Sequence, residues 1–205
     1  GNLDKMLKAV QKAKAESADI VCFAELATCG YPPRDFLEFD DFIHLAEETV
    51  EKLAEAAQDI AIIVGSVSKN PVIEGKDLYN SAYFLADGQI QQVQHKTLLP
   101  TYDIFDEYRY FEPASEWNII EYKGKRIALT ICEDLWNLGN ENPMYTICPM
   151  DELVRLAPDL MINVSASPFS WEHAENRIKT LQANVAAYEL PLFYVNQCGA
   201  QTEVL

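Results

Sequence analysis

Basic residues are scarce in this sequence. Its 205 residues include 16 Lys and Arg against 32 Asp and Glu, which gives a formal net charge of −16 at pH 7. Nucleic acids and anionic membranes are bound by clustered Lys and Arg that neutralise phosphates, and the sequence has no run of these residues. The composition therefore disfavours both classes of partner.

Long apolar runs, cysteine pairs and a secretory signal pattern are also lacking. The longest apolar stretches, such as 60–67, have the length of a strand, whereas a membrane-spanning helix needs about 20 residues. The cysteines are odd in number and scattered, which argues against a disulfide framework or a zinc site of the CxxC type. We therefore expect a reducing, cytoplasmic location. The cysteines are Cys22, Cys29, Cys132, Cys148 and Cys198.

The periodicity of apolar residues predicts helices that alternate with buried strands. Asn2 is the expected N-cap of the first helix, and Asp87-Gly88 predicts a tight hairpin turn. The pattern indicates one α/β domain, with a mixed sheet covered by helices. Helices are predicted over 3–17, 41–58, 150–156 and 171–188, and strands over 19–24, 60–68, 79–85, 89–94, 117–122, 126–131, 160–164 and 192–196.

Three of the extended runs end in a side chain that can take part in catalysis. Glu25, Lys96 and Cys132 each follow such a run directly. A carboxylate, an ammonium group and a thiol are sufficient to hydrolyse an amide through a thioester. Cys132 is then the candidate nucleophile and Glu25 the candidate base, with Lys96 and the backbone N–H of Glu133 as candidate donors to the oxyanion.

Each of these residues also has an ordinary interpretation. Glu25 fits a loop acid that caps a helix, Lys96 fits a solvated lysine, and Cys132 fits a core position. Histidine is the usual base for a thiol, but none of the three histidines has an obvious relation to Cys132. Burial can raise the pKa of a carboxylate toward neutrality and so make it a suitable base. The joint pattern favours the catalytic interpretation.

Three sequence blocks surround the candidate residues: Phe23–Glu25, His95–Pro100 and Thr130–Asp134. They resemble the active-site blocks of the nitrilase superfamily of carbon–nitrogen hydrolases, which use a Glu–Lys–Cys triad in this order. The gaps between the three residues, 71 and 36 positions, are compatible with that layout. The resemblance implies a nitrilase-like α-β-β-α sandwich with mixed sheets, and a first strand that would precede Gly1.

Five further sequence blocks indicate one branch of this superfamily, and the resemblance to that branch extends over nearly the whole chain. Together they are similar to the glutaminase domain of glutamine-dependent NAD⁺ synthetases. This resemblance implies that Glu107 supports Lys96 or the substrate, and that Tyr102, Glu133, Trp136 and Ser167 contact glutamine. Ordinary aromatic packing is an alternative for Tyr102 and Trp136. The blocks are Gly30–Asp35, Phe105–Phe111, Cys132–Trp136, Ser165–Phe169 and Val195–Glu203.

One departure from the family pattern concerns the α-carboxylate of glutamine. Six residues after Ser167 the family often has Arg or Lys, whereas this chain has His173. A neutral imidazole can donate one hydrogen bond, but its electrostatic attraction is weak near neutral pH. Arg177 follows one turn later on the same helical face and is an alternative contact.

The resemblance implies a single carbon–nitrogen hydrolase domain over 1–205 that hydrolyses the side-chain amide of glutamine without a metal or cofactor. The ammonia would serve the ATP-dependent amidation of deamido-NAD⁺ to NAD⁺ in a second domain, which uses ATP and Mg²⁺. No glycine-rich phosphate loop occurs in the sequence, so that domain is expected beyond Leu205. The start without Met and the strand-like end fit a part of a longer polypeptide.

The resemblance also implies an ammonia tunnel and a homo-oligomer. Two other functions stay open: a stand-alone amidase of the same superfamily, and a non-catalytic nitrilase-like module that serves assembly. The sequence beyond Leu205 would separate the first alternative from a synthetase, and selective labelling of Cys132 would separate the second from an enzyme.

Overall fold

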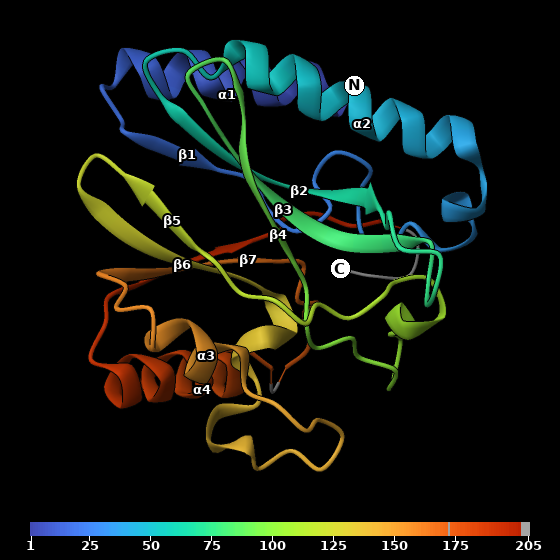
Figure 1. The fold of residues 1–205 in the computed structure, drawn as a ribbon, viewed down its shortest axis with the longest axis vertical. Coiled ribbons are helices and arrows are strands. Elements are labelled where there is room, and N and C mark those ends of the chain that lie inside the picture. The colour runs from blue at the N-terminus through green and yellow to red at the C-terminus, as the bar shows by residue number, and fades with distance from the viewer. Residues whose placement is uncertain (172, 202–205) are drawn as a thin grey trace.

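A computed structural model describes residues 1–171 and 173–201 as four stacked layers, in the order helices, sheet, sheet, helices (Figure 1). Helices α1 and α2 cover the first sheet, and α3 and α4 cover the second. The helices are α1 (Asn2–Ala15), α2 (Asp40–Ala56), α3 (Pro149–Val154) and α4 (His173–Tyr188). Among the described residues, none of the helices combines the length and the hydropathy that a membrane-spanning segment requires.

The first sheet has four strands in the order β1-β2-β3-β4. The pair β1–β2 is parallel, whereas β2–β3 and β3–β4 are antiparallel. Hence β1, β2 and β4 all run in the same direction, and their carboxyl ends meet at one edge. The strands are β1 (Ile20–Cys22), β2 (Ala61–Lys69), β3 (Leu78–Ala86) and β4 (Gln89–His95).

The second sheet has the order β5-β6-β7-β8. Its first pair is an antiparallel hairpin, and β6, β7 and β8 are parallel. The carboxyl ends of β6 and β7 therefore also meet at one edge. The strands are β5 (Ile119–Tyr122), β6 (Lys125–Ile131), β7 (Leu160–Ser165) and β8 (Leu192–Asn196).

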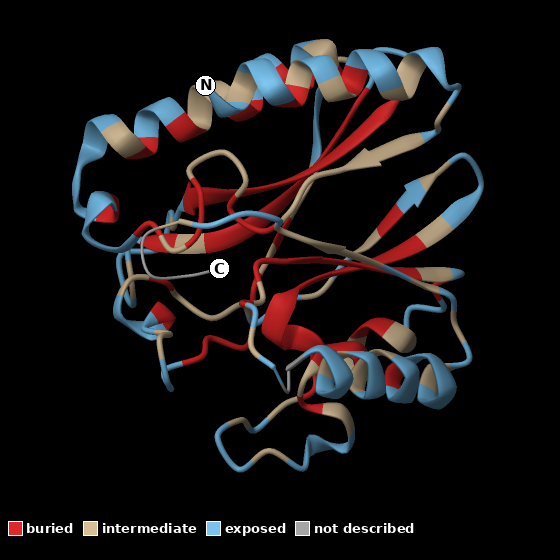
Figure 2. Cartoon of the chain, turned by 180° about the vertical axis from the view of Figure 1, so that it is seen from behind, coloured by how far each residue is buried: buried red, intermediate tan, exposed pale blue. Residues whose placement is uncertain are grey.

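The alternation of side chains along each strand explains the layering. In β2, Ile63 packs in the cluster between the two sheets, and Ile62 packs against α1 and α2. Leu129 of β6 faces the other sheet in the same way, while Ala128 packs against α3. Figure 2 shows that buried residues gather in the strands and on the inner faces of the helices. Because a fully buried aliphatic side chain contributes about 1.5–3 kcal/mol, the two-sided burial stabilises the sandwich.

The predicted α-β-β-α sandwich with mixed sheets is confirmed, and so is the α/β class. The residue pattern alone was wrong in expecting one mixed sheet, because the two hairpins belong to different sheets. The prediction that Asn2 caps the first helix is also wrong. Gly1 is the N-cap, and the Asn2 side chain instead donates to the carbonyl oxygens of Ala27 and Thr28, at 3.2 and 3.3 Å.

Candidate active site

The three candidate catalytic residues follow the carboxyl ends of three strands. Glu25 lies in the turn after β1, Lys96 directly follows β4, and Cys132 directly follows β6. The first two strands belong to one sheet and the third to the other. The facing sheets thus bring together residues that are far apart in the sequence.

Lys96 is fully buried and lies between two carboxylates. Its Nζ donates to Glu25 Oε1 and to Glu107 Oε1, both at 2.7 Å. Glu25 is fully buried and Glu107 nearly so. Buried charges are tolerated in proteins when they are paired and hydrogen-bonded, and this arrangement meets both conditions.

Two further buried side chains complete the network. Asn80 of β3 donates to Glu25 Oε1 at 2.8 Å and to Glu107 Oε2 at 3.3 Å. Tyr31 donates to Glu107 Oε1 at 2.9 Å, and the backbone N–H of Ala166 donates to Glu25 Oε2 at 2.9 Å. The network fixes both carboxylates relative to Lys96.

The titratable side chains in this network shift one another's pKa values. Burial works to lower the pKa of Lys96, but Glu107 and Glu25 outweigh it and hold that pKa well above its usual value. Burial raises the pKa of Glu107 to about 7, although Lys96 acts in the opposite direction. Lys96 is therefore an ammonium cation throughout the physiological pH range.

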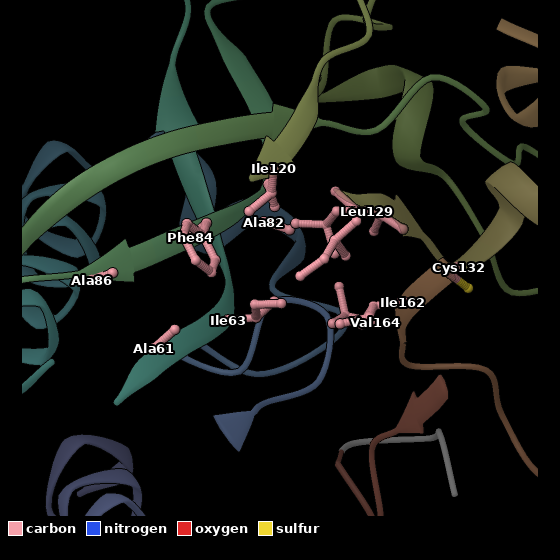
Figure 3. Close-up of a cluster of buried hydrophobic side chains, with 12 residues drawn as sticks. Ala61, Ile63, Ala82, Phe84, Ala86, Ile120, Leu129, Cys132, Ile162 and Val164 are labelled. Atoms are coloured by element: carbon pink, nitrogen blue, oxygen red, sulfur yellow. The ribbon is translucent and has the colours of Figure 1, made fainter. Parts of the chain in front are cut away.

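Cys132 has a special backbone conformation at the end of β6. Its φ is 45°, a value that non-glycine residues rarely adopt and that occurs often at functional sites. The residue begins a short 3₁₀ turn, Cys132–Leu135. Figure 3 shows it at the margin of the aliphatic cluster between the sheets, with its sulfur pointing away from that cluster.

The Cys132 thiol is buried, and its pKa is raised well above the usual value by burial and then by the negative charge of Glu25. Lys96 and a hydrogen bond with Ser165 act in the opposite direction. The resting group is thus a neutral thiol, which needs a base to become a nucleophile. Glu25 acts electrostatically on this thiol and is the candidate for that base.

His95 precedes Lys96 but has other partners. Its Nδ1 lies 2.8 Å from Ser81 Oγ, and its ring stacks on Tyr79 with the centroids 4.1 Å apart. Burial lowers its pKa to about 4. The imidazole is therefore neutral at physiological pH and is used in packing between strands.

Asp134 connects the Lys96 segment to the Cys132 turn. Its Oδ1 accepts the backbone N–H groups of Thr97 and Leu98 at 3.0 and 2.9 Å, and its Oδ2 accepts that of Ile131 at 3.1 Å. The side chain is buried. One carboxylate thus sets the distance between the ends of β4 and β6, which belong to different sheets.

The predicted glutamine contacts divide into two groups. Glu133 and Tyr102 are in direct contact, since the Tyr102 hydroxyl donates to Glu133 Oε1 at 3.0 Å and reaches Oε2 at 3.1 Å. Trp136 is half-buried at the end of the 3₁₀ turn that Cys132 begins, and its backbone N–H donates to the carbonyl oxygen of Glu133 at 2.8 Å. Glu133 and Trp136 thus belong to the turn that Cys132 begins, and Tyr102 reaches this turn from the loop after β4.

Ser167 follows β7, and its backbone is held by the side chain of Asn196 at the end of β8. The Ser167 N–H donates to Asn196 Oδ1 at 2.8 Å, and Asn196 Nδ2 donates to the Ser167 carbonyl oxygen at 3.0 Å. Arg177 of α4 donates through Nη2 to Ser167 Oγ and to the carbonyl oxygen of Pro168, both at 3.0 Å. His173 begins α4, but its side chain lies outside the described part of the structure. The guanidinium of Arg177 is thus in direct contact with Ser167.

Comparison with known proteins identifies the family. The model of the carbon–nitrogen hydrolase family matches residues 1–148. The chain belongs to this family. The candidate residues Glu25, Lys96 and Cys132 all lie within the matched part of the sequence.

Several relatives match this carbon–nitrogen hydrolase over its whole length. It is 40% identical to a glutamine-dependent NAD(+) synthetase of Synechocystis sp. over 100% of this chain and 38% of that protein. A structure of the glutamine-dependent NAD+ synthetase of Acinetobacter baumannii superposes with a TM-score of 0.88 at 31% identity, over 100% of this chain and 36% of that one. The hydrolase thus spans less than two-fifths of the length of these relatives.

A more distant match shows the fold alone. An amidase of Nesterenkonia from the nitrilase superfamily superposes with a TM-score of 0.81 at 19% identity, and the match covers 100% of this chain and 72% of that one. The two mixed four-stranded sheets of the hydrolase are therefore a nitrilase-like fold.

Several site residues of the hydrolase were missed by the sequence analysis or were given no role in it. They are Tyr31, Asn80, Tyr145 and Ser165, which contact candidate residues through their side chains, and Asp134, which binds the backbone next to Lys96 and Cys132. A polar Asn in an otherwise buried strand, as in β3, was an available signal. Tyr145 lies in a polar loop, where no periodic pattern marks it.

Gly65 of β2 allows the Glu25 turn to lie close against the sheet. A Cβ at this position would lie 2.4 Å from the Leu26 nitrogen and 2.6 Å from the Glu25 Cα. These are backbone atoms, so Gly65→Ala should displace Glu25. Since a misplacement of about 1 Å can cost roughly 100-fold in rate, we expect a loss of that order in the initial rate of amide hydrolysis.

Gly124→Ala is the control for this substitution. Gly124 lies in the β5–β6 turn with φ +72° and with nothing within 4 Å of the added Cβ. Alanine there should lower the free energy of unfolding by about 1 kcal/mol and leave the rate unchanged. Full activity in Gly65→Ala would contradict the close approach that we describe.

Proposed function

We propose that this chain hydrolyses the side-chain amide of glutamine through a thioester on Cys132. The observation that supports this most is the fully buried Lys96 between Glu25 and Glu107, beside a thiol at a strand end. The whole-chain similarity to glutamine-dependent NAD(+) synthetases supports glutamine as the substrate.

The hydrogen bonds suggest which atoms act. Glu25 Oε1 already accepts from Lys96 and Asn80, whereas Oε2 accepts only the Ala166 N–H among the described contacts. A carboxylate oxygen has two acceptor sites, so Oε2 has one left for the thiol proton. Lys96 has three N–H donors, of which the described residues use two. The third is available for the oxyanion.

The reaction then has two halves. Glu25 takes the Cys132 proton as the sulfur attacks the amide carbon, and Lys96 with the Glu133 N–H stabilises the tetrahedral oxyanion. When the carbon–nitrogen bond breaks, Glu25 gives its proton to the departing ammonia. Water then attacks the thioester, Glu25 accepts its proton, and glutamate leaves as the proton returns to the Cys132 thiolate.

The substrate contacts follow from the same arrangement. The Glu133 carboxylate would accept hydrogen bonds from the α-ammonium group of glutamine, while Tyr102 and Trp136 would line the aliphatic part of its side chain. Ser167 and Arg177 offer donors to the α-carboxylate, because the Arg177 guanidinium already lies on Ser167. His173 is an additional candidate at the start of the same helix. Glu107 would hold Lys96 in place.

We further propose that the ammonia serves the ATP- and Mg²⁺-dependent amidation of deamido-NAD⁺ in another part of the same polypeptide, within a cytoplasmic homo-oligomer. The amidation step is supported by the relatives' names and by the chain's coverage of only 38% of the Synechocystis protein. A stand-alone amidase of small amides is the alternative.

Product analysis tests this proposal. Glutamine should yield equal amounts of glutamate and ammonia, and acetamide should be hydrolysed far more slowly. A glutamine-directed electrophile such as diazo-oxo-norleucine should add to Cys132 and nowhere else, as detected by peptide mass spectrometry. Preference for acetamide would favour the amidase, and absence of both hydrolysis and labelling would favour a non-catalytic module.

A further inference from the structure

Two tyrosine hydroxyls from different loops hold the buried carboxylate of Glu133. Tyr102, in the loop after β4, lies 3.0 Å from Oε1 and 3.1 Å from Oε2. Tyr145, in the loop after β6, donates to Oε1 at 2.9 Å. The carboxylate next to the candidate nucleophile is therefore fixed by the loops of both sheets.

The two carboxylate oxygens differ in what they accept. A phenol has a single hydrogen, so Tyr102 donates to one oxygen at a time. Within the described part of the chain, the Tyr145 hydroxyl donates to Oε1 only. Oε1 thus accepts from Tyr145 in either case, whereas Oε2 has only a share in the Tyr102 hydrogen and keeps the greater capacity to accept a donor from a substrate.

The loop that carries Tyr145 is held in place by one buried side chain. Asn137 donates to the carbonyl oxygen of Ile147 at 2.7 Å and accepts the N–H of Asn142 at 3.0 Å. The Tyr145 N–H in turn donates to the Asn142 carbonyl oxygen at 3.1 Å. Both sides of the loop are thereby tied to the segment that follows Cys132, so Tyr145 is well placed to position Glu133.

We infer that Tyr145 is a positioning residue for substrate selection, which holds Glu133 Oε1 so that Oε2 faces the α-ammonium group of the amide substrate. The inference rests on the proposed function, because it assigns the ammonium group of glutamine to Glu133. It adds a residue from a loop that the sequence motifs do not include.

The electrostatics of the site support this role. Burial raises the pKa of Glu133, whereas Lys96 and the hydroxyls of Tyr145 and Tyr102 lower it, and Glu25 raises it. Cys132, the preceding residue, is a neutral thiol. The tyrosine hydroxyls thus help to keep a buried carboxylate ionised, and an ammonium group is attracted only to the ionised form.

The test compares two substrates in the Tyr145→Phe variant of the whole native polypeptide. Glutaramate has the amide and the carboxylate of glutamine but lacks the α-ammonium group. We expect kcat/KM for glutamine to fall about 10-fold, mainly through KM, since one hydrogen bond to a charged group is lost. The value for glutaramate should stay unchanged. As the pH is lowered, the ratio of kcat/KM for glutamine to kcat/KM for glutaramate should fall in both proteins. In Tyr145→Phe this fall should begin at a higher pH than in the wild type.

Tyr188→Phe is the matched control, because Tyr188 donates to Asp151 Oδ1 at the same distance of 2.9 Å but on the outer helices. It should leave both substrates unaffected. An equal loss for both substrates in Tyr145→Phe, or no loss for either, would overturn the inference. A wild type that does not hydrolyse glutamine would overturn the proposed function itself, before any variant is compared.

Discussion

Cys132→Ala is expected to abolish glutamine hydrolysis, with a loss of roughly 10⁴-fold or more in kcat, as is typical when a nucleophile is removed. Without the sulfur there is no thioester, and Glu25 and Lys96 alone have no covalent route to glutamate. The fold should persist, because Cys132 lies at the margin of the aliphatic cluster and loses a single atom. The measurements are the initial rate of glutamate formation and the free energy of unfolding.

Cys148→Ala provides the matched control. Cys148 is equally buried and also a free thiol, but its sulfur contacts the Tyr188 hydroxyl at 3.3 Å and packs with α3. Its replacement should cost stability and leave the rate of hydrolysis intact. If Cys132→Ala keeps a tenth of the wild-type rate, or if Cys148→Ala abolishes it, the assignment of the nucleophile is wrong.

Much of the fold could be predicted from the sequence because its signals are local. The Asp87-Gly88 turn fixed one hairpin, and the run at 192–196 coincides with β8. Periodicity shows that a strand is buried but not against which neighbour. The division into two sheets therefore could not be predicted from the residue pattern, and it followed only from the family resemblance.

The candidate site divides in the same way. Glu25, Lys96 and Cys132 could be found because each interrupts the pattern at the end of a strand. Asn80 stands out only as a polar residue in a buried strand, and its role, like that of Asp134, could not be predicted because it depends on contacts between segments that are far apart in the sequence. Tyr145 could not be predicted either, because its loop has no local signal and only folding brings its hydroxyl to Glu133.

Lys96→Met is expected to cost both activity and stability. Removing the ammonium group leaves Glu25 and Glu107 buried without a counter-charge, and breaking a buried ion pair in this way costs about 3–5 kcal/mol. Without Lys96 the pKa of Glu107, which burial already raises to about 7, rises further above its value in the unfolded chain, so the folded state binds more protons and its stability falls as the pH rises above about 4.5. Denaturant unfolding at pH 5.5 and 8 should show the larger loss at pH 8.

A second variant separates the two roles of Lys96. In Lys96→Met combined with Glu107→Gln, one buried charge is removed, so part of the lost stability should return while hydrolysis stays absent, because the donor to the oxyanion is still missing. Lys52→Met is the surface control: its partner Glu48 lies 3.0 Å away on the exposed face of α2, and the cost should stay below about 0.5 kcal/mol. If Lys96→Met is no more destabilising than Lys52→Met, the carboxylates do not depend on Lys96 for their charge balance. If the double variant recovers hydrolysis, Lys96 acts only by neutralising Glu107, and the oxyanion role belongs to the backbone N–H alone.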